Sequence, residues 1–189
     1  MQTSRVLVIG LAALALVWAA PAQAQGPQAS LVEEVRRATK RFQDPSAATG
    51  AGYAPFLGCV SGPQGGAMGV HYVNGDLVGD GKLDPLKPEA LMYEPRGGKL
   101  NLVGVEYIVI AAAWDAANKT PPVLLGQTFH HTGSPNRYGI PAFYALHVWA
   151  WKANPSGMFV DWNPKVSCEE YTAAGEGAMQ TSSAHGAKH

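Results

Sequence analysis

The stretch that is densest in aromatic and apolar residues together covers residues 141–151, and it contains one ionisable group, His147. In a strand, alternate side chains point to opposite faces of the sheet. One face would then carry Phe143, Ala145, His147, Trp149 and Trp151, and the other Tyr144, Leu146, Val148 and Ala150. Both faces are apolar, which predicts a central strand covered on both sides. A buried imidazole there needs a hydrogen-bond partner or a metal ion, because an unpaired buried polar group costs ~1–3 kcal/mol.

Near the N-terminus, apolar residues recur at helical spacing, with charged residues covering the opposite side. The apolar stripe consists of Leu31, Val35, Ala38 and Phe42. Ser30 and Glu33 have the spacing of a capping box, which predicts a helix with Ser30 as its N-cap. Pro45 ends this helix or starts a second short turn that finishes at Gly50 and Gly52.

From Tyr53 onward, short apolar runs alternate with Gly, Pro, Asn and Asp. This pattern predicts strands over residues 67–73, 90–94, 100–110 and 143–151, with a weaker strand over 123–129. Residues 95–98 form a short turn, so the second and third strands are expected to pair as a hairpin. Residues 111–117 fit one helical turn. We expect an α+β domain in which the N-terminal helix packs on a mostly antiparallel sheet of four to five strands.

Residues 1–24 have the pattern of an export signal, with Arg5, an apolar segment over 6–20, and Ala22-Gln23-Ala24 as a cleavage site. The expected divisions are this signal peptide, a lead-in and helix over 25–52, one β-rich core over 53–168, and a flexible tail over 169–189. The mature chain is expected to be periplasmic or extracellular, without stable membrane insertion after cleavage.

Cleavage would remove Arg5 alone among the charged residues and leave 13 basic and 14 acidic side chains. That balance argues against electrostatic binding of nucleic acid or an anionic membrane. The two cysteines, Cys59 and Cys168, stand near the ends of the core. In an oxidising compartment they predict one disulfide, and two thiolate ligands to a metal are the alternative.

Two other predicted strands each carry a single ionisable residue in apolar sequence, His71 and Glu106. With His147 they would form a set of two histidines and one carboxylate. That set suits one divalent transition metal with open positions, such as Fe, Zn, Mn or Cu. Gly69 and Gly104 share faces with these residues and would leave room for a ligand or a close backbone approach. The alternative is a satisfied core pair in which the buried Glu and His fix each other's protonation.

Further residues could contribute to a site. His131 could add a ligand or a gate, although a solvated loop histidine is the alternative, and Tyr72 is a second accessory candidate. The sequence contains no nucleophile elbow, phosphate loop, dinucleotide fingerprint or HExxH motif.

Two patterns have a plainer interpretation beside the functional one. The aspartates at 76, 80 and 84 with Gly81 match only part of a calcium loop, since Val78 and Lys87 occupy ligand positions, and a surface loop is the alternative. A sugar-binding platform could form from Trp114, Trp149, Trp151, Trp162, Tyr53, Tyr72, Tyr93 and Tyr144. Core packing is the alternative use of Trp149 and Trp151.

The chain also resembles a family of secreted bacterial proteins. The resemblance is carried by residues 58–63 (GCVSGP), 66–74 (GAMGVHYVN), 88–95 (PEALMYEP), 102–106 (LVGVE), 146–149 (LHVW), 154–159 (NPSGMF) and 162–168 (WNPKVSC). It covers nearly all of the mature domain. It implies export and a shared fold, but no reaction. His71, Glu106 and His147 fall within the matching stretches.

Three classes of function remain open from the sequence. The first is a secreted metal-dependent protein, with or without enzymatic activity. The second is a non-catalytic module that binds an unidentified small molecule. The third is a structural envelope protein with a buried His/Glu network.

Overall fold

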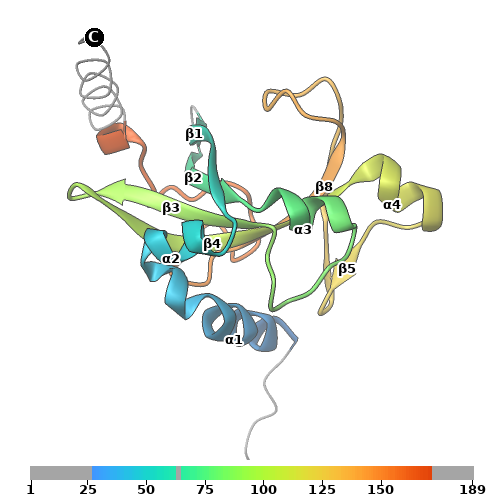
Figure 1. Cartoon of the computed structure of the whole chain (residues 1–189), viewed down its shortest axis with the longest axis horizontal. Helices are drawn as coiled ribbons and strands as arrows, with labels where there is room; N and C mark the ends of the chain where they lie inside the picture. The colour runs from blue at the N-terminus through green and yellow to red at the C-terminus, as the bar shows by residue number, and fades with distance from the viewer. Residues whose placement is uncertain (1–26, 63–64, 172–189) are drawn as a thin grey trace, which may run out of the picture.

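The computed structural model describes residues 27–62 and 65–171 (Figure 1). The first helical elements are α1 (Pro27–Thr39), η1 (Lys40–Gln43) and α2 (Pro45–Gly50). The core then follows as β1 (Ala54–Gly62), β2 (Gly66–Val73), α3 (Gly75–Asp80), β3 (Ala90–Arg96), β4 (Lys99–Ile110), α4 (Ala111–Ala117), β5 (Val123–Leu124), β6 (Gln127–Thr128), β7 (His130–Thr132) and β8 (Phe143–Val148). The predicted signal peptide and residues 172–189 of the predicted tail lie outside the described residues.

Six strands form the main sheet in the order β1-β2-β3-β4-β8-β7, and every neighbouring pair is antiparallel. The α+β prediction and the β3–β4 hairpin are confirmed. The prediction of four to five strands was too small, because β1 and β7 went unrecognised. The weak strand expected over 123–129 is a separate two-stranded hairpin, β5–β6.

Strand β1 has no apolar alternation that would mark it in the sequence. It is an edge strand whose first four residues are exposed, and it includes Pro55 and Gly58. Its pairing with β2 breaks between Phe56 and Cys59, where Leu57 adopts a positive φ of 59°. Proline, glycine and an irregular register are features of edge strands, and they hid β1 in the sequence.

One face of the sheet is covered by the N-terminal helices (Figure 1). Leu31 and Val35 of α1 are fully buried and share a core cluster with Tyr107 of β4 and Leu146 of β8. The predicted stripe is thus confirmed in its main members. The predicted N-cap is wrong: the helix begins at Pro27, a residue favoured in the first helical turn, so Ser30 lies inside it.

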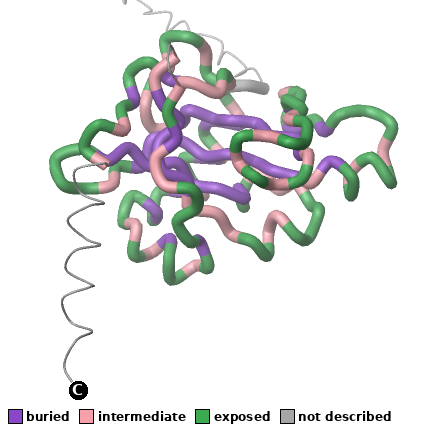
Figure 2. Tube along the Cα trace, turned by 90° about the horizontal axis from the view of Figure 1, so that it is seen from above, coloured by how far each residue is buried: buried purple, intermediate pink, exposed green. Residues whose placement is uncertain are grey.

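The opposite face of the sheet carries two smaller core clusters, and buried residues follow the central strands in Figure 2. One of these clusters packs Trp149 with Met92, Val103 and Val166. Strand β8 ends at Val148, so the alternation expected as far as Trp151 stops there. Trp151 instead packs against the helix-side cluster and donates a hydrogen bond to Thr39 Oγ1 at 3.0 Å.

Cys59 and Cys168 form the predicted disulfide, which joins β1 to the C-terminal segment across 109 residues of sequence. The alternative of two thiolate ligands is therefore wrong. Residues 169–171, the first three of the predicted tail, form a short helical turn, in which the Tyr171 amide donates a hydrogen bond to the Cys168 carbonyl oxygen. Among the described helices, none is both long and apolar enough to cross a membrane.

We expect the denatured, non-reduced mature protein to contain no free thiol, because both cysteines are joined in this bond. Thiol titration before and after reduction measures this directly. The expected values are zero thiols before reduction and two after it. Two free thiols in the non-reduced protein would contradict the prediction.

Candidate metal centre

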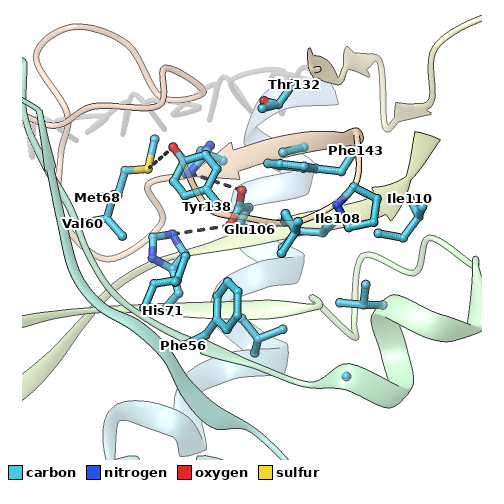
Figure 3. Close-up of a pocket in the computed structure, with 18 of the residues that line it drawn as sticks. Phe56, Val60, Met68, His71, Glu106, Ile108, Ile110, Thr132, Tyr138 and Phe143 are labelled. Atoms are coloured by element: carbon cyan, nitrogen blue, oxygen red, sulfur yellow. Dashed lines mark hydrogen bonds and ion pairs between the residues drawn. The ribbon is translucent and has the colours of Figure 1, made fainter. Parts of the chain in front are cut away.

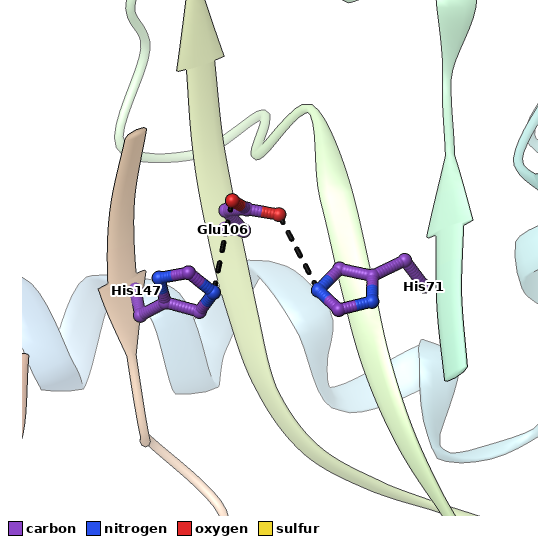
Figure 4. A group of neighbouring side chains, drawn as sticks. All are labelled: His71, Glu106 and His147. Atoms are coloured by element: carbon purple, nitrogen blue, oxygen red, sulfur yellow. Dashed lines mark ion pairs between the residues drawn. The ribbon is translucent and has the colours of Figure 1, made fainter. Parts of the chain in front are cut away.

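The three ionisable residues come from three strands of the main sheet. Glu106 on β4 lies directly opposite His147 on β8. His71 lies on β2, and β3 separates it from β4. Glu106 pairs with Ala90 on β3, whose small side chain leaves the space over β3 open. Figure 4 shows the side chains of His71 and Glu106 meeting above that strand.

The predicted convergence of His71, Glu106 and His147 is confirmed. One ligand atom from each residue lies within 4.8 Å of the others, and all three residues are buried. The Nε2 atom of His71 lies 3.4 Å from Glu106 Oε2. The Nε2 atom of His147 lies 3.6 Å from Glu106 Oε1. Each carboxylate oxygen thus faces one imidazole (Figure 4).

These separations are longer than those of short charge-assisted hydrogen bonds. Charge-assisted hydrogen bonds between an imidazole and a carboxylate are about 2.7–2.9 Å long. Ligands that each lie ~2.0–2.2 Å from one ion are roughly 3.0–3.5 Å from each other. The distances of 3.4 and 3.6 Å are closer to the second value. The two His–Glu separations are therefore compatible with neighbouring ligands of one ion.

Asp161 is a second carboxylate in contact with His147. Its Oδ1 lies 3.2 Å from His147 Nδ1 and 3.3 Å from His130 Nδ1. Within the described part of the chain, neither ring nitrogen of His147 makes a hydrogen bond of good geometry. Burial alone lowers the pKa of His147, but the charges of Glu106 and Asp161 outweigh burial and raise it. Without a cation at the site, the two carboxylates therefore stabilise the protonated form of His147 relative to burial alone.

His71 is in a different electrostatic state. Burial lowers its pKa and outweighs the opposing effect of Glu106, and the charge of His147 lowers it further. The backbone of Gly69 beside the same imidazole also opposes this lowering of the pKa. Histidines that ligate metals commonly direct their second nitrogen to a backbone carbonyl or carboxylate, which fixes the ring. The backbone at Gly69 and the carboxylate of Asp161 match these two kinds of support.

A cavity of about 480 Å³ lies against the three residues, on the sheet face opposite α1 (Figure 3). Its walls are mainly apolar and include Val60, Met68, Ile108, Ile110, Ile140 and Phe143. His71, Glu106 and His147 lie together among the lining residues. Cavities of this size and character typically accept small molecules.

The glycines beside the site make close backbone approaches and do not provide ligand space. A Cβ on Gly69, whose φ is +92°, would lie 2.4 Å from the carbonyl oxygen of Tyr93. A Cβ on Gly104 would lie 2.7 Å from both Met92 Cε and the Val148 carbonyl oxygen. The close-approach alternative is therefore the correct one.

The two accessory candidates lie away from the cavity. His131 is exposed on β7, and its ring lies 5.0 Å from that of Tyr144, on the other side of the strand from His130. Tyr72 packs edge-on against Tyr93 at a ring distance of 5.0 Å, on the helix-covered face. Neither residue lines the cavity.

The fold also decides between the alternative interpretations of two other sequence patterns. The aspartate-rich segment folds partly into α3, and Gly81 ends that helix in the left-handed conformation. Among the described residues, His71, Glu106 and His147 are the one group whose ligand atoms could hold a metal ion. Trp149 is 2% exposed, so it cannot contribute to a sugar platform.

Three residues near the site were not predicted as site residues from the sequence. Asp161 and His130 line the cavity from loop and edge positions, and Tyr138 does so from the segment between β7 and β8. No periodicity marks any of them. The one usable signal was an aspartate and a tyrosine in loops, and a histidine in a short edge strand, of a chain with few charged residues.

Glu89 is a buried carboxyl group beside the site, and its role is structural. It is 1% exposed, and its Oε2 accepts a hydrogen bond from the Ile108 amide at 3.0 Å. Burial raises its pKa to about 8, although the Ile108 hydrogen bond opposes the shift. Strand β3 begins only at Ala90, so the Glu89 carboxyl group takes the place of a strand partner for the Ile108 amide of β4.

This raised pKa predicts how stability depends on pH. Between the ordinary pKa of a glutamate and about 8, the folded protein binds the Glu89 proton more tightly than the unfolded chain. The stabilising contribution is therefore complete at acidic pH and is lost as pH rises through about 8. Urea unfolding measured from pH 5 to 9 should show a fall in the free energy of unfolding, and this fall should be smaller in Glu89→Gln. Equal slopes in the two proteins would contradict the prediction.

The sequence matches no protein-family model, no curated protein and no solved structure at a significant level.

Proposed function

We propose that this chain is an exported metal-dependent protein that holds one divalent transition metal through His71, Glu106 and His147. Two neutral imidazoles and one carboxylate suit Fe(II), Zn, Mn or Cu and leave coordination positions open. Those positions are accessible from the adjoining cavity. A metal ion with open positions beside a cavity is the arrangement that a metal-dependent enzyme requires.

The observation that carries this proposal is the separation of the ligand atoms. Both His–Glu distances exceed a hydrogen bond, yet all three ligand atoms lie within 4.8 Å of one another. A purely structural network would gain by closing these gaps, because a buried polar atom without a partner is costly. A bound cation satisfies the two imidazoles and the carboxylate at once.

The second candidate is a non-catalytic module that binds a small molecule without metal. The observation that favours it is the cavity itself, whose walls are mainly apolar. In that case, the His/Glu group would serve as a polar anchor at one side of the cavity. Saturable ligand binding by metal-free protein would support this candidate.

Elemental analysis of mature protein purified without a polyhistidine tag tests the metal proposal. We expect about one equivalent of one transition metal after reconstitution and desalting, with an unfolding temperature that falls when a chelator removes it. The double variant His185→Ala/His189→Ala is the control for adventitious binding by histidines near the C-terminus. Binding that disappears in this control, or no binding in the wild type, would refute the proposal.

Metal affinity should also fall as pH decreases. Protons and the ion compete for the imidazole nitrogens, and only the neutral ring binds metal. Because the carboxylates raise the pKa of His147, the loss should begin above the usual range for histidine. Metal titrations from pH 8 to 5 measure this dependence, and a pH-independent affinity would be inconsistent with histidine ligands.

A further inference from the structure

The cavity beside the metal centre is divided into an apolar part and a small polar part. Aliphatic and aromatic side chains form most of its lining, and the ionisable groups lie around Glu106. Phe56 and Leu57 of β1 also line it while remaining 37% and 51% exposed. An apolar molecule approaching β1 therefore meets apolar side chains that continue into the cavity.

Tyr138 adds a hydroxyl group to the polar part. Its ring lies over the cavity near Glu106 in Figure 3. Burial raises the pKa of Tyr138, and the charge of Glu106 raises it further. Among the described residues, the hydrogen-bond partner of its hydroxyl is the sulfur of Met68, at 3.9 Å. A thioether is a weak acceptor. The Tyr138 hydroxyl can therefore turn to a better acceptor inside the cavity.

The charge of the occupied centre favours an anion. A divalent ion with two neutral imidazoles and one carboxylate has a net charge of about +1. Asp161 adds a further negative charge beside His147, but its side chain is partly open to solvent, which screens its effect on the ion. A positive charge beside apolar walls is costly unless a neighbouring anion compensates for it. An oxygen anion on a ligand would supply this compensation and fill an open coordination position.

We infer that the cavity binds a small, mainly apolar organic acid, whose carboxylate coordinates the metal and accepts a hydrogen bond from Tyr138. This inference rests on the proposed metal centre and names the class of its ligand. The apolar body would occupy the space between Ile108, Ile140 and Phe143. A cavity of about 480 Å³ accommodates a fused-ring or medium-chain acid.

The test uses 2-naphthoate and naphthalene as a matched pair of probes with the same apolar body. Calorimetric or fluorescence titrations are made with metal-loaded and metal-free protein, and elemental analysis verifies the metal content. In metal-loaded protein, naphthoate should bind about tenfold or more tightly than naphthalene, because charged contacts are stronger than neutral ones. In metal-free protein, this preference should be lost, or reversed because the Glu106 carboxylate repels the carboxylate of naphthoate.

Two variants locate the site. Tyr138→Phe should weaken naphthoate binding several-fold and leave naphthalene binding unchanged. Ala145→Met narrows the cavity beside His147 and should weaken both probes, whereas Ala116→Met on the exposed side of α4 should weaken neither. Thermal melts verify that each variant is folded. If Ala145→Met does not fold, Tyr138→Phe still tests the assignment.

The outcomes separate this inference from the proposed function. Metal-loaded protein that binds neither probe, or binds both equally, would overturn the ligand assignment while the metal centre stands. Protein that takes up no metal but binds naphthoate would refute the metal centre and the coordination role together. Naphthoate binding that is unchanged in both Tyr138→Phe and Ala145→Met would place the ligand elsewhere and overturn the inference.

Discussion

Glu106→Gln is expected to lower metal affinity by about 100-fold or more while the protein remains folded. Glu106 is the one carboxylate among the three proposed ligands, and it is the residue that faces both imidazoles. Its replacement by a neutral amide removes the negative charge that balances the ion, and amide oxygens are poor ligands for transition metals. The metal content of the reconstituted variant and competitive chelator titrations measure the loss.

Glu89→Gln is the matched control for this variant. Glu89 is also buried and lies next to Ala90, the residue that pairs with Glu106, but its side chain accepts a hydrogen bond from the Ile108 amide. It should retain the metal. His147→Ala and His131→Ala form a second matched pair. His147→Ala removes a proposed ligand, whereas His131→Ala removes an exposed histidine that packs against Tyr144, away from the cavity.

The structural alternative predicts a different result. If Glu106 only satisfies two buried histidines, wild-type protein takes up no metal. Removing the carboxylate then costs stability, ~3–5 kcal/mol when one partner of a buried charged pair is lost. A Glu106→Gln variant that is strongly destabilised without metal, beside a metal-free wild type, would establish that alternative.

The three proposed ligands could be predicted because each is the single ionisable residue of an apolar strand. A buried group of this kind needs a partner, and strands of one sheet are the nearest source. The sequence did not predict how His71 reaches Glu106, since β3 intervenes between their strands. That contact depends on the register that places Ala90 opposite Glu106, and register is a property of the folded sheet.

Asp161 and Tyr138 could not be predicted by the same argument. Both lie in irregular segments, where neither the helical nor the strand period assigns a side chain to a face. Their positions depend on long-range contacts that bring these loops back over the sheet. One such contact joins Arg137 to the carbonyl oxygen of Ser61 at 3.0 Å. Loops therefore supply Asp161 and Tyr138 to the cavity, while strands supply the proposed ligands.

Trp149 links the aromatic segment to the loop that carries Asp161. Its Nε1 donates a hydrogen bond to the Val160 carbonyl oxygen at 2.6 Å, and its backbone amide donates one to Met158 at 3.1 Å. Its indole packs against Met92, Val103 and Val166. The side chain thus fills the core beside the site and holds the residues that precede Asp161.

Trp149→Ala should lower the free energy of unfolding by about 3–5 kcal/mol, because it removes a fully buried aromatic side chain and leaves a cavity. Urea unfolding of metal-free protein measures this loss without a contribution from ligand binding. Trp114→Ala is the control, since that indole is only partly buried and should contribute less. The Asp161 loop should also become less fixed, with about tenfold weaker metal binding in any variant that still folds. An effect of less than ~1 kcal/mol would contradict the packing of Trp149 in the core.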